Sequence, residues 1–406
     1  MPSPPAPRAL ICFWEEYIGV APSIINAIRR LAENGYRVDV VVRDLRTDYP
    51  EAPEFPAGVK IIALQSKKRV FEDKRGRPAW IRKALNCAVL AISARDFIVG
   101  AARELRGRSY DVAFGVDLFG LMAASAVARN STVHRLAYWS LEIYFLSTIR
   151  NPVVRWAKKR EIALSRSVDL VIAQDTERGR TLALENGFTE QRIACVPNSP
   201  MGRPGRVDTS FFHRRFSLSS DIRIVLHAGM ISSAVQPVAL ARAAASWPEP
   251  YRLLFHERQQ RSPEDPFIRE VAEASRNRAI MSLDPVPYDQ LDSVFASAWA
   301  GVVYYADDMG PNFNQIAAAS GKLAFCLRNG VPVVVRNLPS LQRMIDSTRC
   351  GVAVSQPSEI LDALARIAED YEGYRRRALS CFDDLLDFRP LFDDALERLV
   401  SNEATV

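Results

Sequence analysis

Short, strongly apolar runs alternate with helical patterns along almost the whole of this 406-residue chain. In residues 9–42, for example, the run ALICFW is followed by isoleucine and leucine at helical spacing and then by YRVDVVV. Apolar runs of about four to eight residues that alternate with helices are typical of parallel strands buried on both faces of a sheet. The pattern therefore predicts an α/β fold built from βαβ units.

The alternation occurs in two halves. Residues 199–208 (SPMGRPGRVD) are rich in Pro, Gly and Arg, and the strand pattern restarts after them with IRIVLHA at 222–228. A chain of this length is long for one domain and long enough to form two. We predict a disordered tail at residues 1–8 and Rossmann-like domains at residues 9–200 and 201–386, followed by an amphipathic helix at residues 387–402.

The loop after the first strand is a candidate ligand site. In doubly wound sheets, ligands bind beyond the carboxyl ends of the strands, which points here to residues 15–19 (EEYIG). Gly19 would allow the backbone to approach a ligand closely. An ordinary loop glycine explains the same residue equally well.

Residues 304–337 contain the candidate site of the second half. A polar loop leads to a helix that is predicted to begin at Ser320, Gly321 and Lys322 and to stop at Gly330, before the run VPVVV. A helix that opens on Ser-Gly presents unpaired N–H groups and the positive end of its dipole to an anion. The pattern indicates a phosphate site, with an ordinary Ser-capped helix as the alternative.

One basic segment accounts for the chain's formal net charge of +6, because residues 67–83 contain eight basic and two acidic residues. Trp80 and Ile81 are interleaved with these charges, which favours an anionic membrane surface. A solvated loop and a core-packed helix are the alternative. No nucleic-acid-binding module accompanies the segment, so nucleic acid is not an expected partner. The basic residues are Lys67, Lys68, Arg69, Lys74, Arg75, Arg77, Arg82 and Lys83.

The six cysteines are scattered without a CxxC or Cys/His spacing, which favours reduced thiols in a cytoplasmic protein over a zinc site or a disulfide framework. The N-terminus has no signal-peptide pattern. The most apolar helical stretch, residues 84–102, is interrupted by Arg95 and Asp96. We therefore expect no transmembrane helix.

Three segments resemble the GT-B glycosyltransferases, family 4 in particular. Residues 320–345 (SGKLAFCLRNGVPVVVRNLPSLQRMI) resemble that family's Lys-Leu-Phe-Glu-Tyr-Leu and Gly-x-Pro-Val-Val run. Residues 165–199 resemble the stretch that ends in Pro-Asn at the domain junction, and residues 33–43 resemble an early strand. The resemblance implies two Rossmann-like domains facing a central cleft, with the C-terminal helix crossing back to the first domain.

The chain departs from the family at two acidic positions. The family has two glutamates separated by seven residues, and counting back from Gly330 places Phe325 and Ala317 at these positions. By the resemblance, these glutamates contact the ribose and the sugar of a nucleotide-sugar donor. Residues of the preceding loop that can replace them are Asp307, Asp308 and Asn314.

The resemblance also implies transfer without a bound metal or cofactor, in which helix N-termini and basic side chains stabilise a leaving diphosphate. The family's Arg and Lys after the first strand of the second domain are absent, since Gly229 is followed by Met-Ile-Ser-Ser. No Asp-x-Asp motif is present to hold a divalent ion. The donor-binding candidates are Gly19, Gly229, Ser232, Ser233, Asn314, Ser320, Gly321 and Lys322.

Glu142 is the catalytic candidate. It ends WSLE, where the family has a Ser-His-Glu-like segment, so the histidine is replaced and the acid remains. It would act as an acid/base or stabilise an oxocarbenium ion, and a surface or inter-domain ion pair is the alternative. Among the four histidines, His227 alone is positioned for a cleft role, with a satisfied core histidine as the alternative.

The predicted function is transfer of a sugar from a nucleotide-diphospho-sugar to a glycan or lipid-linked glycan acceptor. The resemblance to family 4 implies a retaining reaction. A cytoplasmic location, with residues 67–83 on the inner face of a membrane, is the matching expectation. A non-catalytic scaffold or sugar-nucleotide sensor of the same fold is the main alternative, because both family glutamates are missing. A sugar-nucleotide epimerase comes last, since no motif indicates it.

Overall fold

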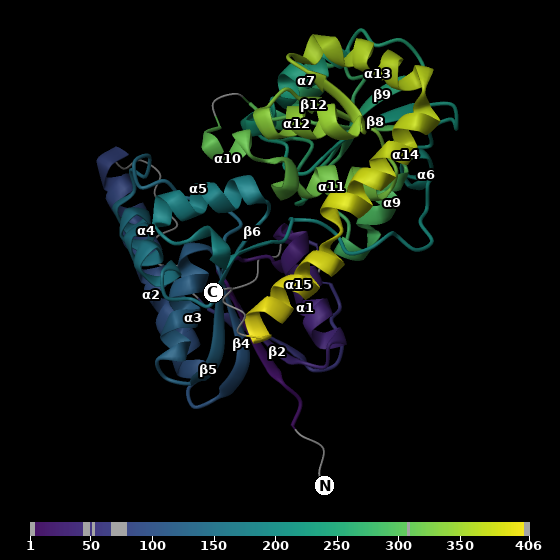
Figure 1. Ribbon diagram of the computed structural model, residues 1–406. Coiled ribbons are helices and arrows are strands. Elements are labelled where there is room, and N and C mark those ends of the chain that lie inside the picture. The colour runs from purple at the N-terminus through teal and green to yellow at the C-terminus, as the bar shows by residue number, and fades with distance from the viewer. Residues whose placement is uncertain (1–4, 44–48, 51–52, 66–78, 307–308, 402–406) are drawn as a thin grey trace. The chain divides into compact units, whose positions relative to one another are not determined.

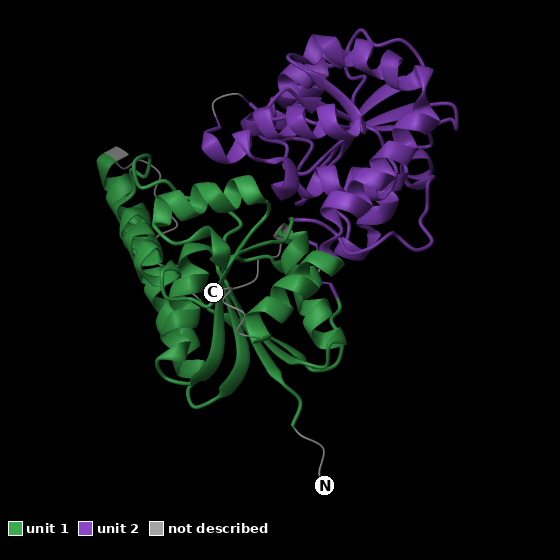
Figure 2. Ribbon diagram, viewed as in Figure 1, with its two compact units in different colours: residues 1–46, 54–197, 389–406 green, residues 47–53, 198–388 purple. Residues whose placement is uncertain are grey.

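The computed structural model describes residues 5–43, 49–50, 53–65, 79–306 and 309–401. Its chain divides into two compact units (Figure 2). Unit 1 comprises residues 1–46, 54–197 and 389–406, and unit 2 comprises residues 47–53 and 198–388. Each unit contains one parallel sheet with helices packed on it, so the predicted α/β fold of two Rossmann-like parts is confirmed.

The unit 1 sheet has the order β3-β2-β1-β4-β5-β6-β7, and every described pair is parallel. Its central strands consist of apolar residues because both faces of the sheet are covered. The strands are β1 (Arg8–Phe13), β2 (Arg37–Arg43), β3 (Val59–Leu64), β4 (Ser109–Val116), β5 (Thr132–Trp139), β6 (Leu170–Ala173) and β7 (Ile193–Cys195).

Helices cover both faces of this sheet, with α2, α3 and α4 on one side and α1 and α15 on the other (Figure 1). Leu10 and Cys12 of β1 pack with Phe97 of α2 and Ala123 of α3 in one buried cluster. The helices are α1 (Pro22–Glu33), α2 (Ala79–Glu104), α3 (Asp117–Ala128), α4 (Pro152–Ser165), α5 (Thr176–Asn186) and α15 (Phe388–Ser401).

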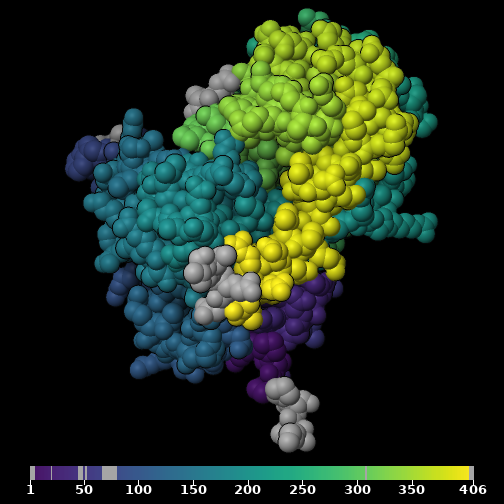
Figure 3. All heavy atoms as spheres, in the orientation of Figure 1, coloured from purple at the N-terminus to yellow at the C-terminus, as the bar shows by residue number. Residues whose placement is uncertain are grey.

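The C-terminal helix α15 returns to unit 1, as the resemblance implies. Phe392 stacks on Trp139 of β5 with ring centroids 5.8 Å apart, and Asp393 accepts two hydrogen bonds from Arg30 of α1, of 2.7 and 2.8 Å. Figure 3 shows the atoms of α15 at the surface, beside those of the N-terminal residues. The last helix is therefore an integral part of the first sheet's cover.

The unit 2 sheet has the order β10-β9-β8-β11-β12-β13, again parallel in every described pair. Numbered from its own first strand this is 3-2-1-4-5-6, the usual doubly wound order. The strands are β8 (Arg223–Ala228), β9 (Tyr251–His256), β10 (Ile280–Ser282), β11 (Ala300–Val303), β12 (Val333–Arg336) and β13 (Gly351–Val354).

Helices α7, α8 and α13 pack on one face of this sheet in a buried cluster. On the other face α11 approaches β11 closely at Gly301, where a Cβ atom would overlap Sγ of Cys326. The helices are α6 (Phe211–Arg215), α7 (Pro237–Ala244), α8 (Pro266–Ala274), α9 (Leu291–Ala296), α10 (Pro311–Asn314), α11 (Gly321–Arg328), α12 (Pro339–Thr348), α13 (Ile360–Glu369) and α14 (Tyr371–Cys381).

Three local features differ from the sequence-based expectation. Strand β3 was not expected, because as a partly exposed edge strand it lacks a strong apolar run. Small apolar residues predict a helix at residues 121–127, but α3 begins at Asp117, since it follows β4 without a Gly or Pro turn. The apolar spacing at residues 357–378 predicts one helix. The structure divides it at Asp370, whose side chain accepts the Gly373 N–H and so starts a second helix, α14.

Within the described residues, one helical stretch, Trp80–Glu104 of α2, is long and apolar enough to cross a membrane by length and composition. Arg95 and Asp96 do not lower its mean hydropathy below 1.5. A single such helix is weak evidence, because core helices pass the same test. The buried side chains of Phe97 and Ala101 show that one face of α2 belongs to the core of unit 1.

Candidate functional site

Each unit has a point where the strand order reverses, and its carboxyl edge is the expected place for a ligand. In unit 2 this point lies between β8 and β11, and in unit 1 between β1 and β4. The residues that follow these strands define two candidate edges, which we call the unit 2 edge and the unit 1 edge. The two edges carry very different side chains.

At the unit 2 edge, the loop after β8 is held in a fixed conformation. Gly229 has φ +111°, which side chains rarely adopt, and its N–H donates to the His256 carbonyl over 2.9 Å. The buried carboxylate of Glu257 accepts the N–H of Ile231 at 2.9 Å. These bonds hold the backbone that leads to the next two donor candidates, half-buried Ser232 and exposed Ser233.

Helix α11 begins where the sequence predicts, at Gly321, with Ser320 in extended conformation before it. Ser320 does not cap the helix; its hydroxyl lies 3.0 Å from the hydroxyl of Tyr305, which follows β11. The N-cap residue of α11 thus makes no side-chain hydrogen bond to the helix start, and Gly321 adds no side chain there. A helix start without a side-chain cap suits an anion.

Lys322 lies on the first turn of α11, half-buried, with Nζ 3.2 Å from Nε2 of His227 and 5.2 Å from the centre of the Tyr305 ring. Burial and the guanidinium of Arg258 lower the pKa of Lys322 to about 7. Burial and Lys322 lower the pKa of His227 well below its usual value. His227 is thus a neutral acceptor for the lysine, and among the described residues its Nδ1 has no hydrogen-bond partner.

Arg258 is a site residue that the sequence analysis missed. It lies two residues after the end of β9, and its positive charge helps to lower the pKa of Lys322. Among the described residues no carboxylate forms an ion pair with Arg258 or Lys322, and the buried Nε of Arg258 has no hydrogen-bond partner. A basic residue just after a strand, at a carboxyl edge, was the available signal. Two basic side chains beside a helix start form a site for an anion.

The remaining unit 2 candidates lie elsewhere. Asn314 is exposed at the end of α10, and no hydrogen bond joins it to another described residue. Asp307 and Asp308 lie outside the described residues. Phe325 is buried and stacks on Phe295 with ring centroids 5.1 Å apart, so a family glutamate is replaced there by a core aromatic.

At the unit 1 edge, Asp117 is the second residue that the sequence analysis missed. It follows β4 at the strand reversal and has φ +54°, a strained value for a residue other than glycine. Its Oδ1 accepts the N–H groups of Leu141 and Glu142 at 2.8 and 3.1 Å. Burial, together with the charges of Glu142 and Glu15, raises the pKa of Asp117 to about 8, although these hydrogen bonds oppose the shift.

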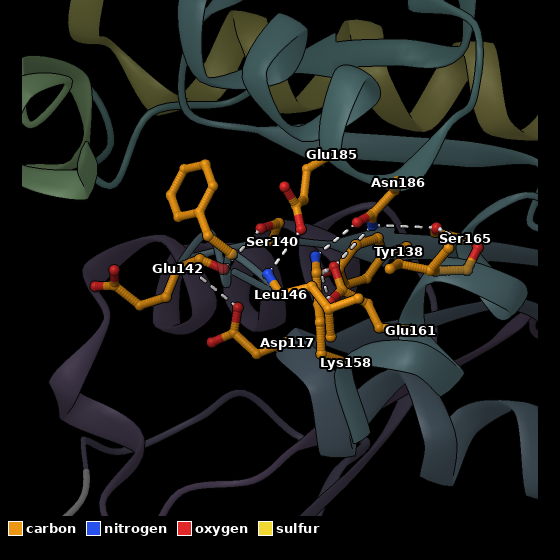
Figure 4. A network of polar contacts seen from close by, with 12 residues as sticks. Asp117, Tyr138, Ser140, Glu142, Leu146, Lys158, Glu161, Ser165, Glu185 and Asn186 are labelled. Atoms are coloured by element: carbon orange, nitrogen blue, oxygen red, sulfur yellow. Dashed lines mark hydrogen bonds and ion pairs between the residues drawn. The ribbon is translucent and has the colours of Figure 1, made fainter. Parts of the chain in front are cut away.

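The turn that carries Glu142 is fixed from several sides (Figure 4). Besides Asp117, Gln174 donates to the Ser140 carbonyl at 2.7 Å, and the buried Arg178 donates to the Leu141 carbonyl at 2.8 Å. The carboxylate of Glu142 itself is exposed and points away from this network in Figure 4. The arrangement fixes the backbone and leaves the acid available to react.

A fully buried ion pair stabilises the elements behind this turn. Lys158 and Glu161 of α4 are 2.9 Å apart, and Asn186 at the end of α5 bonds to both, at 2.6 and 2.8 Å. Tyr138, next to the turn on β5, donates to Glu161 at 2.7 Å (Figure 4). The two buried charges are paired with each other, so this network serves to hold β5, α4 and α5 together.

Gly19 lies in the short helix Ile18–Val20 that follows β1. The ring of Tyr17 covers it so closely that a Cβ atom at this position would overlap the ring. The donor-binding role of Gly19 stays a prediction. In the described part of the chain, no group of three or more His, Cys, Asp or Glu residues is arranged to hold a metal ion.

Comparison with known proteins agrees with this architecture. Residues 17–199 match the family model described as Glycosyltransferase Family 4. A D-inositol 3-phosphate glycosyltransferase from Nocardiopsis dassonvillei is 25% identical over 245 residues, which cover 56% of this chain and 52% of that protein. The match thus spans about half the length of this curated relative.

Solved structures show the same fold over almost the whole chain. Sucrose-phosphate synthase from Thermosynechococcus elongatus superposes with a TM-score of 0.65 at 15% identity, covering 97% of both chains. Anabaena HepE in complex with UDP-glucose gives 0.64 at 14% identity, covering 97% of this chain and 99% of its own. Residues 17–199 are thus similar to the Glycosyltransferase Family 4 model, and the solved structures show that the chain as a whole has the GT-B fold.

Proposed function

We propose that this protein transfers a sugar from a nucleotide-diphospho-sugar to a glycan or lipid-linked glycan acceptor, with retention of configuration and without a bound metal. The observation that carries the proposal is the pair of basic side chains, Lys322 and Arg258, at the start of α11, with no described carboxylate in an ion pair with either of them. The UDP-glucose complex of the Anabaena neighbour supports a nucleotide sugar as the anionic ligand.

The proposed role of the unit 2 edge is to stabilise the leaving group. When the bond between the anomeric carbon and the phosphate oxygen breaks, the electron pair stays on the diphosphate. Lys322, Arg258 and the N–H groups at the start of α11 would hold the charge that develops there. His227 would keep Lys322 aimed at the phosphate, since it accepts from the amine without carrying a charge of its own.

The proposed role of the unit 1 edge is to serve the sugar and the acceptor. Glu142 would stabilise the oxocarbenium character of the anomeric carbon, and Asp117 would keep the Glu142 backbone in position. In a retaining reaction the acceptor oxygen bonds to the anomeric carbon on the face that the phosphate leaves. The acceptor proton then passes to the departing phosphate oxygen, so no separate base is needed.

A cytoplasmic location and a lipid-linked acceptor are part of the same proposal. The basic segment at residues 67–83 is the sequence feature that supports them. Of that segment, residues 67–78 lie outside the described residues, and only the start of α2 is described. A lipid-linked acceptor would require the protein to reach a membrane surface, and the basic charges would favour an anionic one.

The test is to offer the purified chain a panel of nucleotide sugars and to measure binding by calorimetry and release of the nucleoside diphosphate. One donor should bind, and Lys322→Met should weaken it about tenfold to a hundredfold through loss of a charged hydrogen bond. Lys159→Met, on the exposed face of α4, is the matched control and should bind as the parent does. Equal binding by the Lys322 variant would refute the phosphate site.

A non-catalytic sugar-nucleotide sensor is the second candidate. The buried position of Phe325 favours it, because no carboxylate is present where the family places one. A sensor would bind the same donor, and Lys322 would matter equally. Donor turnover that depends on Glu142 therefore supports the transferase, whereas tight binding without turnover in the presence of acceptor glycans supports the sensor.

A further inference from the structure

An apolar groove of about 810 Å³ lies on unit 1, and neither Asp117 nor Glu142 belongs to its lining. It is formed by α2, α3 and α4, which pack together on one side of the sheet (Figure 1). The apolar residues of its lining include Ile98, Val99, Met122, Val153, Trp156 and Leu164. The mechanism proposed above does not use this groove.

The groove is accompanied by large apolar side chains that remain exposed. Val99 is 53% exposed and Trp156 is 46% exposed, and both line the groove. On the same helix α2, Ile92 and Trp80 are also exposed, Trp80 at 71%. Exposed apolar side chains beside an apolar groove indicate a binding or membrane surface, and tryptophan is common at the level of lipid headgroups.

The charges around the groove are all of one sign. Arg95, Arg129 and Arg160 belong to its lining, which contains no acidic residue. Among the described residues none of these three arginines forms an ion pair. The single acid of α4, Glu161, is buried and paired with Lys158, so α4 exposes only basic charge. The surface is thus an apolar groove with a cationic rim.

We propose that this groove docks unit 1 on an anionic phospholipid bilayer, with a lipid chain in the groove and its phosphate against the arginine rim. The proposal gives the membrane part of the proposed function a defined surface, separate from residues 67–78. A bilayer fits better than a second copy, because a symmetric dimer would bring six arginines together without a carboxylate. A membrane-spanning position of α2 does not fit, since the opposite face of this helix is buried in the core of unit 1.

The experiment is co-sedimentation of the full chain with vesicles of phosphatidylcholine, alone or with 30% phosphatidylglycerol, about one lipid in three. No nucleotide sugar is added, so its outcome is separate from that of the transferase proposal. Val99→Glu should lower binding to anionic vesicles at least tenfold. Its new glutamate is four residues from Arg95 and Arg103, which supports the helix. Leu184→Glu on α5, where Leu184 is 85% exposed, is the matched control and should bind normally.

The charge part is tested by Arg95→Gln with Arg160→Gln, which should lower binding about 25-fold, or fivefold per arginine. Arg242→Gln, on the exposed face of α7, should have no effect. Equal binding of Val99→Glu and the parent, no binding by the parent, or equal binding to both vesicle types would overturn the proposal. So would a parent dimer that Val99→Glu converts to a monomer, because the groove would then hold a second copy.

Discussion

The two edges have the same topology, but one carries basic side chains and the other acidic ones. At the unit 2 edge, Lys322 and Arg258 meet beside an uncapped helix start, and the nearby Glu257 is turned to backbone N–H groups. At the unit 1 edge, Asp117 and Glu142 follow neighbouring strands, and Arg178, a cation close to Glu142, is buried and bonded to backbone. The same strand order thus presents a cationic edge in one unit and an acidic edge in the other.

The sheet therefore determines where residues of the site lie, and the side chains that follow the strands determine what each site can bind or catalyse. A cationic edge suits the diphosphate of a donor, while an acidic edge suits sugar hydroxyls and a cationic transition state. The predictions below separate the two edges, because each variant should affect either binding of the donor or the chemical step.

The largest expected effect is at the unit 1 edge. Glu142→Gln keeps the size of the side chain and removes its charge, so turnover should fall about 10²- to 10⁴-fold while the donor dissociation constant stays unchanged. The measurement is kcat from release of nucleoside diphosphate, together with donor affinity from calorimetry. Glu397→Gln, on the exposed face of α15, is the matched control. If the Glu142 variant lost donor affinity, Glu142 would take part in donor binding, and the proposed division of roles between the two edges would be wrong.

The sequence predicted the fold well because its information is local and periodic. Apolar runs such as VVVR in β12 and the Asn329-Gly330 helix stop are visible without any tertiary contact. The start of α11 and the position of Lys322 followed from the same local signals. The strand β3 was missed because an edge strand buries little and so carries a weak apolar pattern.

Asp117, which follows β4, and Arg258, which follows β9, were missed for a different reason. Asp117 lies in a left-handed conformation that normally signals glycine, and no turn residue marks the end of β4. Arg258 acts on Lys322 only because β9 and α11 come together in the folded unit, 64 residues apart in sequence. Interactions that depend on tertiary packing leave no trace in the spacing of residues.

The next largest effect is expected at the unit 2 edge. Arg258→Gln should weaken donor binding about tenfold to a hundredfold, because a charged contact to the diphosphate is lost. It should also raise the pKa of Lys322, since the neighbouring positive charge disappears. Calorimetry at pH 7 measures the affinity, with Arg242→Gln as the control on α7. Unchanged affinity would mean that the arginine faces away from the donor.

A smaller effect should follow from pH. Lys322 has a pKa of about 7 without ligand, so it loses its charge as the pH rises above 7. The anionic donor favours the charged lysine, and the donor dissociation constant should therefore increase by up to tenfold per pH unit between about pH 7.5 and 9. Lys322→Arg should remove this dependence, because arginine stays charged. A flat profile in the parent would place the lysine outside the donor contact.

The smallest effect concerns the loop that shapes the cationic edge. Gly229→Ala should cost about 1–2 kcal/mol of stability, because φ +111° is strained for any side chain, and should lower Tm by about 2–8 °C. Space is not the reason, since a Cβ atom would lie 3.5 Å from Lys322, an ordinary contact. Gly205→Ala, with open surroundings and an ordinary φ, is the control and should leave Tm unchanged or slightly raised. Since the Gly229 N–H already donates to His256, we expect donor affinity to change little. A large loss of affinity with unchanged Tm would instead show that this glycine touches the donor, and the cationic edge would then extend to the end of β8.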